Sequence, residues 1–340
     1  MKRLDLMVAL AVWCALVALV RPTQAQVTKT IQVDCAKGQT INKALRVPAE
    51  ELIIEISGIC EEDVEINREN VILRGSDPAL DGISGTATGY VPGIAVLTVR
   101  NVVRFRVENL AVLDGVGSGM RFSSTLAAEV VNCRVEGNAV AGIQAPHGQV
   151  FVTDTTVTGS AWGVMGFDST YLECVRCTVT GNNFMGVGAY SDARVQVSDS
   201  EISSPIGLYS AEASQLWVDD STVEGTSQGI SVIDGGQVTI SGSEVSGPIS
   251  VESNGLVLFD DTDQIANSAG LNSLTVDATM ELTSGSSLLG DTSIDGFSKL
   301  LVRDTSALNG NLACSAGGDA YCDRPANVTG TSTCGLCPSP

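Results

Sequence analysis

A regular internal repeat constrains the fold of this chain more than any other feature of its sequence. The segments VFVTDTTVTGSAWGVMGFDST, LECVRCTVTGNNFMGVGAYSDA and LWVDDSTVEGTSQGISVIDGG are degenerate copies of one unit. One apolar position marks each unit, and the markers are Val112, Val135, Val157, Val179, Ile202, Val223 and Val245. Their residue numbers increase in nearly equal steps from one marker to the next. A fixed period in this range predicts a solenoid in which each unit forms one coil.

Each unit has the pattern of three short strands separated by turns. Apolar and polar residues alternate in segments such as VFV and QVQV, which is typical of strands. Gly, Asp, Ser and Asn gather between these segments and favour turns. Stacked units of this kind predict three parallel sheets, with coils about 4.8 Å apart.

The same register predicts which side chains face the interior. The markers are expected to point inward, and so are the residues two positions before them and a further row in the preceding strand. The first of these rows is Cys133, Thr155, Cys177, Ser200, Ser221 and Ser243, and the second is Val130, Val152, Cys174, Val197, Val218 and Ile240.

The units resemble the coils of the right-handed parallel β-helix, the pectin lyase-like superfamily. The passage TIQVDCAKGQTINKALRVPAEELIIEISG is similar to that family's usual opening, in which a strand leads into a short capping helix. The resemblance implies an all-β, right-handed parallel β-helix with three parallel sheets and an N-terminal cap helix near residues 40–46. We expect about ten coils, with wider coils after residue 255, where the repeat loosens.

The N-terminal segment 1–25 has the features of a secretory signal peptide. Lys2 and Arg3 precede an apolar run from Leu6 to Val20, and Ala25 ends a small-residue cleavage site. The expected organisation is therefore a signal peptide over 1–25, the β-helix over 26–310 and a cysteine-rich C-terminal cap over 311–340. Such a protein would be secreted, either extracellular or periplasmic, with no membrane insertion after cleavage.

The mature chain would be strongly acidic. The whole chain has 19 Lys and Arg against 39 Asp and Glu, and cleavage removes Lys2, Arg3, Arg21 and Asp5. Phosphate binding depends on Lys and Arg, so the composition argues against nucleic acid as a partner. Polyanionic substrates would also be repelled unless a divalent cation screened them.

The ten cysteines of the chain become an odd number after cleavage, because Cys14 is lost with the signal peptide. At least one thiol is therefore left over in an oxidising compartment. The predicted free, buried thiol is Cys133. Cys35 and Cys60 flank the predicted cap and are expected to link it.

The other cysteines leave alternatives open. We expect Cys174 and Cys177 to form a local disulfide or to remain two inert thiols, rather than to act as a redox motif. The four cysteines of the tail allow three disulfide pairings, and the alternative to disulfides is a zinc site. The tail cysteines are Cys314, Cys322, Cys334 and Cys337.

One turn of successive coils carries a column of ionisable residues. The column consists of His147, Asp168, Asp192, Glu212 and Asp234. Stacked carboxylates repel one another unless a cation intervenes, and Ca²⁺ prefers such oxygen ligands. The alternatives are that these residues simply favour turns, or that a pair of them acts as catalytic carboxylates. No cofactor is required by the sequence, and Ca²⁺ at the four acidic positions is the one metal considered.

The strand after that turn has an outward face that combines aromatic rings with amides. Rings pack against the apolar faces of sugars, while amides both donate and accept hydrogen bonds. Aromatic residues also favour exposed strands for structural reasons, so an inert surface is the alternative. The predicted carbohydrate-binding residues are Gln149, Phe151, Tyr171, Glu173, Arg194, Gln196, Gln215, Trp217 and Gln237.

The catalytic constellations of active relatives are mostly missing from the sequence. Lyases of the superfamily place an Arg or Lys base beside calcium-binding aspartates, but Arg121, Arg134, Arg176 and Arg194 fall on different columns here. His147 lacks the neighbours of a catalytic histidine. We therefore expect no catalytic residues and a non-catalytic scaffold or binding protein whose partner is a polysaccharide or cell-surface glycan. The alternative is a calcium-assisted polysaccharide lyase or glycoside hydrolase, with its site near the long insertion at 76–95.

Overall fold

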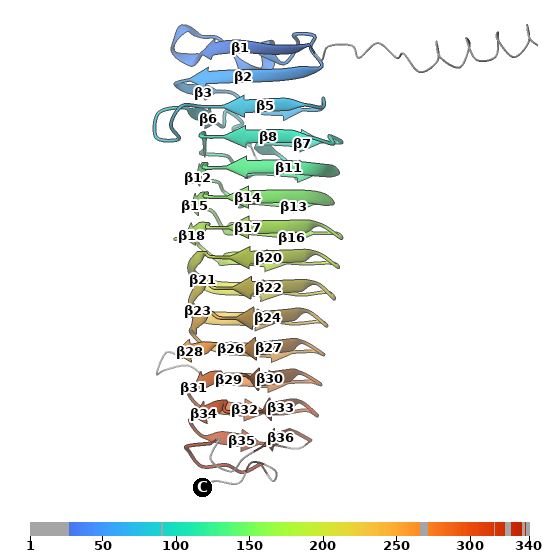
Figure 1. Cartoon of the computed structure of the whole chain (residues 1–340), viewed down its shortest axis with the longest axis vertical. Helices are drawn as coiled ribbons and strands as arrows, with labels where there is room; N and C mark the ends of the chain where they lie inside the picture. Colours follow the sequence, from blue (N-terminus) through green and yellow to red (C-terminus); the bar gives the residue numbers. More distant parts are fainter. Residues whose placement is uncertain are drawn as a thin grey trace, which may run out of the picture.

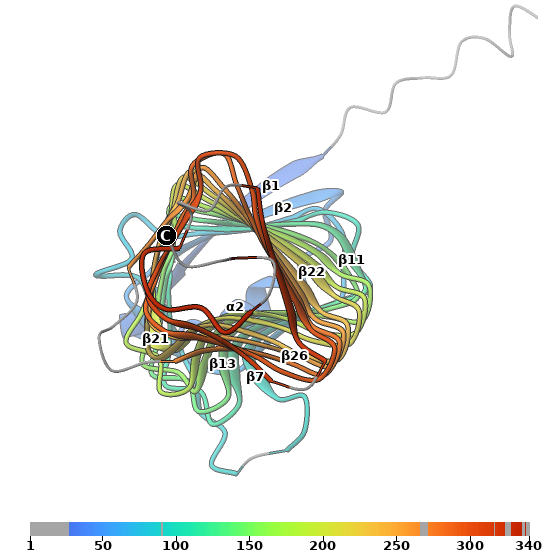
Figure 2. The ribbon, with the colours of Figure 1, turned by 90° about the horizontal axis from the view of Figure 1, so that it is seen from below.

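The computed structural model describes residues 27–89, 91–265, 271–315, 317–323, 328–334 and 337. The chain winds through about 13 turns of an all-β solenoid, and its neighbouring strands run parallel. Figure 1 shows the coils stacked along the long axis, and Figure 2 shows the outline of the coils seen along that axis. The predicted fold class, a parallel β-helix with three sheets, is confirmed. The predicted signal peptide lies outside the described residues.

Three ladders of hydrogen-bonded strands form the walls of the solenoid. Ladder A, which is the 14-stranded sheet, runs the full length of the described coils. Its strands are β1 Thr28–Asp34, β2 Glu51–Ser57, β5 Val71–Arg74, β8 Phe105–Glu108, β11 Thr125–Val131, β14 Gly148–Thr153, β17 Tyr171–Val175, β20 Arg194–Ser198, β22 Gln215–Asp219, β24 Gln237–Ser241, β27 Leu256–Asp260, β30 Thr279–Thr283, β33 Lys299–Val302 and β36 Asp319–Cys322.

Ladders B and C share two long strands and so form one 22-stranded sheet. The shared strands are β21 Glu201–Ser210 and β23 Thr222–Val232. Ladder B also contains β3 Ile59–Glu61, β6 Gly82–Ser84, β9 Ala111–Leu113, β12 Arg134–Glu136, β15 Thr156–Thr158, β18 Thr178–Thr180, β25 Glu244–Ser246, β28 Asp263–Ile265, β31 Ser287–Leu289 and β34 Ala307–Asn309. Ladder C also contains β4 Val64–Ile66, β7 Ala95–Arg100, β10 Ser118–Ser123, β13 Ala141–Pro146, β16 Trp162–Phe167, β19 Met185–Ala189, β26 Ile249–Glu252, β29 Asn272–Thr275, β32 Thr292–Ile294 and β35 Leu312–Cys314.

The interior rows predicted from the repeat are confirmed. The seven markers are at most 1% exposed, and the residues of the other two rows are at most 6% exposed. In the row that begins at Cys133, the side-chain hydroxyls form hydrogen bonds from one coil to the next. Ser200 Oγ accepts from the Cys177 N–H at 2.9 Å, and Ser221 Oγ accepts from the Ser200 N–H at 3.1 Å. These bonds satisfy buried backbone donors at the corner between ladders A and B.

Glycine recurs near the start of the ladder C strands because no side chain fits there. A Cβ on Gly142 would lie 2.2 Å from Cγ1 of Val157 and 2.9 Å from the carbonyl oxygen of Gly163. The next residue, Ile143, also belongs to the interior core. Two successive positions therefore face the interior, which interrupts the ordinary alternation of a strand.

The number and width of the coils differ from the expectation. We predicted about ten coils, whereas the structure has about 13. We also predicted wider coils after residue 255, but Thr279 pairs with Lys299 and Lys299 pairs with Asp319, so these coils are narrower than the central ones. Shorter turns explain the loss of the regular period there, since the strands keep their ladder positions.

A short helix, α2 Ile41–Ala44, follows the 3-10 turn η1 Cys35–Lys37 at the N-terminal end. The Thr40 hydroxyl accepts a hydrogen bond from the Lys43 N–H, and Ile41 is fully buried. In Figure 2, α2 lies within the outline of the coils. A capping role for this helix stays a prediction, as do the three domain boundaries. None of the described helices is long and apolar enough to cross a membrane.

Candidate carbohydrate-binding face

The nine predicted carbohydrate-binding residues lie together on the outer surface of ladder A, here called face A. They occupy five neighbouring strands, β14, β17, β20, β22 and β24, and form two parallel rows. The first row is Gln149, Tyr171, Arg194, Gln215 and Gln237, and the second is Phe151, Glu173, Gln196 and Trp217. All nine are exposed or half-buried, because the alternate residues of the same strands fill the core.

Aromatic and polar side chains contact one another across the coils of face A. The rings of Phe151 and Tyr171 are tilted, with centroids 6.0 Å apart. The Tyr171 hydroxyl lies 3.3 Å from Glu173 Oε2 and 3.1 Å from Gln196 Oε1. Burial and the charge of Glu173 raise the pKa of Tyr171, so its hydroxyl stays protonated and can donate a hydrogen bond.

Several polar groups of face A have no partner among the described side chains. Trp217 is half-buried, and its indole N–H makes no hydrogen bond within the described part of the chain. The Arg194 guanidinium is exposed and is likewise unpaired there. A flat strip with half-buried rings, amide groups and unused donors can bind a hydroxyl-rich ligand lying across the coils.

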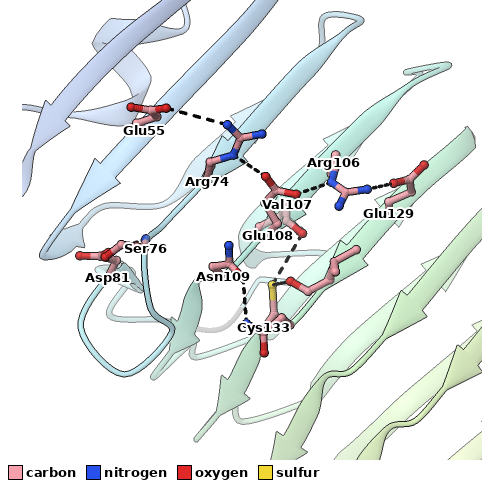
Figure 3. Close-up of polar contacts among 12 residues, drawn as sticks. Glu55, Arg74, Ser76, Asp81, Arg106, Val107, Glu108, Asn109, Glu129 and Cys133 are labelled. Atoms are coloured by element: carbon pink, nitrogen blue, oxygen red, sulfur yellow. Dashed lines mark hydrogen bonds and ion pairs between the residues drawn. The ribbon is translucent and has the colours of Figure 1, made fainter.

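A charged network that sequence reasoning missed continues face A toward the N-terminus (Figure 3). Glu108 accepts from both Arg74 and Arg106, and Arg106 also pairs with Glu129. Arg74 lies 3.9 Å from Glu55 as well. Burial alone would raise the pKa of Glu108, but the hydrogen bonds and charges of the two arginines outweigh it and lower that pKa.

An open depression of about 420 Å³ lies beside this network on the same face. Its lining includes Asn70, Ile72, Arg104, Arg106 and Glu129. The Arg104 guanidinium makes no ion pair or hydrogen bond with a described residue. The alternation in the segment RFRV, with buried Phe105 between two arginines, is the signal that could have placed both guanidinium groups on face A.

The acidic column lies at the turns that lead into the strands of face A. All five of its residues, His147, Asp168, Asp192, Glu212 and Asp234, adopt the left-handed conformation with φ between 50° and 61°. Asp is enriched in that conformation, which favours the turn interpretation. His147 Nδ1 lies 2.6 Å from the Asp168 carbonyl oxygen. The described residues contain no group of three or more His, Cys, Asp or Glu that could hold a metal. Calcium at this edge stays a prediction.

The structure pairs all eight cysteines proposed for disulfides. Cys35 pairs with Cys60 and Cys174 with Cys177. In the tail, Cys314 pairs with Cys334 and Cys322 with Cys337, which selects one of the three possible arrangements. Cys133 is the free cysteine of the described chain and is 3% exposed. Burial raises the pKa of its thiol to about 12, so it is an inert core residue.

The four arginines considered as candidates for a lyase base do not lie together. Arg194 lies on ladder A, Arg121 on ladder C and Arg134 on ladder B, while Arg176 lies in a turn and pairs with Asp154 at 2.7 Å. In the long insertion, Asp81 accepts from the backbone N–H groups of Gly58 and Ser76, both at 2.8 Å, which is a structural role.

Comparisons with known proteins concern the fold. Residues 145–279 match the family described as "Right handed beta helix region". No curated protein sequence matches the chain. Among solved structures, the A-module of mannuronan C-5 epimerase AlgE6 from Azotobacter vinelandii is 14% identical, with a TM-score of 0.49 over 83% of this chain and 90% of that one. A catalytic domain of GH87 alpha-1,3-glucanase is 11% identical, with a TM-score of 0.49 over 92% and 70%.

A third similar structure, ORF18 of Geobacillus virus E2, is 12% identical with a TM-score of 0.44 over 89% of this chain, and the chain spans 60% of its length. Similarity at this level does not bear on activity. The family match over residues 145–279 and the three ladders of stacked coils show that this chain has the fold of a right-handed parallel β-helix.

Proposed function

We propose that this chain is a secreted, non-catalytic β-helix protein that binds a polysaccharide along face A. The observation that carries the proposal is the pair of rows on β14, β17, β20, β22 and β24, where rings and amides stand in register on successive coils. The four disulfides are compatible with an oxidising, extracellular setting.

The shape of face A suits a long ligand. The coils that carry the nine residues are nearly equal in length, as the successive partners Gln149, Tyr171, Arg194, Gln215 and Gln237 show. Their turns are therefore short and raise no walls beside the strip. The aromatic rings supply apolar surface, and the neighbouring Gln side chains supply donors and acceptors for hydroxyl groups. The depression toward the N-terminus extends the polar surface by several coils.

The carboxylates of face A are poorly suited to catalysis. Glu173 lies beside the Tyr171 hydroxyl, and Glu108 and Glu129 are paired with arginines. A general acid or nucleophile needs a carboxylate that is free to approach the scissile bond. This pairing is the reason for preferring binding to cleavage.

The test is affinity electrophoresis in gels that contain soluble polysaccharides, or column retention on insoluble ones, with a double variant of the strip. Trp217→Ala with Tyr171→Ala should weaken retention by about one to two orders of magnitude, since each aromatic contact contributes roughly 0.5–1.5 kcal/mol beyond its buried area. Phe297→Ala removes a 72% exposed ring elsewhere and should leave retention unchanged. Unaltered retention of the double variant, with an unchanged melting temperature, would overturn the assignment to face A.

A further inference from the structure

A second apolar cluster lies outside the solenoid wall, on ladder C. Its centre is Met165 and Met185, both 0% exposed, yet they belong to a cluster separate from the interior core. Met165 lies in register with Gln144 and Gly188, which alternate with the interior residues of their strands. A Cβ on Gly188 would lie 2.7 Å from both methionine sulfurs, so the two thioethers fold over this glycine.

Four aromatic residues cover the methionines and remain partly exposed. We call Trp162, Met165, Phe167, Met185, Tyr190 and Tyr209 the aromatic patch. Phe167 stacks on Tyr190 with ring centroids 5.3 Å apart, and Tyr190 stacks on Tyr209 at 4.9 Å. The stack follows the spacing of the coils, so the patch is a straight strip that runs along the solenoid axis.

The interior core is a cluster of its own, separate from this patch. The coils are already held by their ladders and by the continuous row of buried aliphatic residues inside. Partly exposed Trp, Tyr and Phe side chains gathered within a polar surround are typical of binding surfaces. Gln144 on the N-terminal side and Gln228 on the C-terminal side belong to that surround.

Carboxylates border the patch along one edge. Asp168 follows Phe167, Asp192 lies shortly after Tyr190, and Glu212 lies shortly after Tyr209. All three carboxylates are exposed. The charge of this edge therefore complements a cationic ligand, as does the net charge of −20 of the whole chain.

Basic residues lie beyond the borders of the patch. Arg121 lies on ladder C, one strand beyond Gln144, and Arg194 lies across the turn on ladder A. The three carboxylates of the edge are exposed to solvent. Glu212 accepts a hydrogen bond from Ser191 Oγ, and Asp168 Oδ2 lies 3.7 Å from His147 Nε2, whereas the Asp192 carboxylate has no side-chain partner among the described residues.

We propose that the aromatic patch and its acidic edge bind a cationic amino-sugar polymer, at a site separate from face A. The apolar C–H faces of the sugar rings would pack on Trp162 and the exposed parts of the stacked rings, and the ammonium groups would pair with Asp192 and Glu212. A linear polymer matches a strip that repeats its ring and its carboxylate on successive coils. The Gln144 Oε1 atom already accepts from Ser118 Oγ and the Arg121 guanidinium. The amide NH2 group of Gln144 and the two tyrosine hydroxyls would supply hydrogen bonds to the sugar hydroxyls.

The experiment compares two oligomers of equal length, glucosamine and N-acetylglucosamine, by titration calorimetry with the full mature chain at about pH 5.5, where most carboxylates are ionised. The glucosamine oligomer should bind and the neutral oligomer should bind at least tenfold more weakly. Raising the salt concentration should weaken binding of the cationic oligomer. Equal binding of the two oligomers, or no binding of the glucosamine oligomer, would overturn the proposal.

Two sets of variants assign the site. Asp192→Asn with Glu212→Gln removes charge without changing shape and should weaken binding of the glucosamine oligomer at least about threefold. The matched control is Asp277→Asn with Asp304→Asn, which removes two exposed, left-handed turn carboxylates far along the chain from the rings and should have no effect. Unchanged binding by the first pair would contradict the proposal.

Ring variants separate this site from face A. Trp162→Ala with Tyr190→Ala should abolish binding of the glucosamine oligomer, while Trp217→Ala with Tyr171→Ala should preserve it. The opposite pattern would place the amino-sugar polymer on face A and refute a second site. The charge variants keep the test valid if the ring variants do not fold.

Discussion

The interior glycines of ladder C offer the sharpest test of how the coils pack. Gly142→Ala would place a Cβ 2.2 Å from Cγ1 of Val157 and 2.9 Å from the carbonyl oxygen of Gly163. Carbon atoms in contact are normally about 3.5–4.0 Å apart, so the wall of the coil must shift. Overpacking of this kind costs roughly 1–3 kcal/mol.

Because the new Cβ would collide with Val157, a double variant can distinguish this collision from a general loss of stability. Val157→Ala alone deletes two buried methyl groups and should cost about 2 kcal/mol, from lost transfer energy and the cavity left behind. In the double variant, the deleted methyl group is the one that collides with the new Cβ. The double variant should therefore be more stable than the sum of the two single changes predicts, by about 1 kcal/mol or more.

The assay is urea unfolding followed by circular dichroism, with midpoint and slope compared among the variants. Gly89→Ala is the control, because a Cβ there meets no atom within 4 Å and should leave the midpoint unchanged. A Gly142→Ala midpoint equal to that of the wild type would refute the packing argument. Strict additivity in the double variant would show that Val157 is not the group that excludes the side chain.

Four further outcomes follow from the structure. The Cys133 thiol, buried and with a pKa raised to about 12, should react with thiol reagents only after unfolding, and fast reaction of the folded protein would contradict its burial. The pKa of Glu108 is lowered in the folded state, so its ion pairs stabilise the protein above the unfolded pKa of about 4.3, and this stabilisation is lost as the pH falls through the folded pKa. Glu108→Gln should therefore flatten the acid limb of the curve of stability against pH, and an unchanged limb would count against the network. Replacing Cys322 and Cys337 by Ser opens a short-loop bridge worth about 3 kcal/mol and should speed proteolysis at the C-terminal end, whereas unchanged proteolysis would show that this bridge does not hold the tail. If the acidic column holds calcium, a chelator should lower the melting temperature, and no shift would leave the column as turn residues.

The repeat predicted the inward rows correctly because the same backbone position recurs in every coil. Val135, Val157 and Val179 could be aligned without knowing the fold, and their neighbours followed from strand alternation. The predicted count of about ten coils was too low, in part because wider coils were expected after residue 255, whereas Thr279 pairs with Lys299 and Lys299 with Asp319, so the coils there are narrower than the central ones.

The surface features were predictable only where alternation is regular. Face A could be placed because its central strands alternate regularly, as in the buried and half-buried residues of Tyr171–Val175. The aromatic patch was missed because Gly163 and Val164 both face the interior, so the outward direction of Trp162 and Met165 does not follow from counting. Each strand of face A begins after a left-handed turn. The φ values of these turns depend on contacts between coils, so they do not follow from strand alternation.

The central claim, that face A binds polysaccharide without cleaving it, is tested most directly by incubating the mature protein with neutral and acidic polysaccharides in the presence of calcium. Both retention of the protein and the appearance of new chain ends are measured. Retention that depends on Trp217 and Tyr171, without new chain ends, is the predicted result. New chain ends would instead make the protein a lyase or hydrolase, and no retention on any polysaccharide would contradict a binding role for face A.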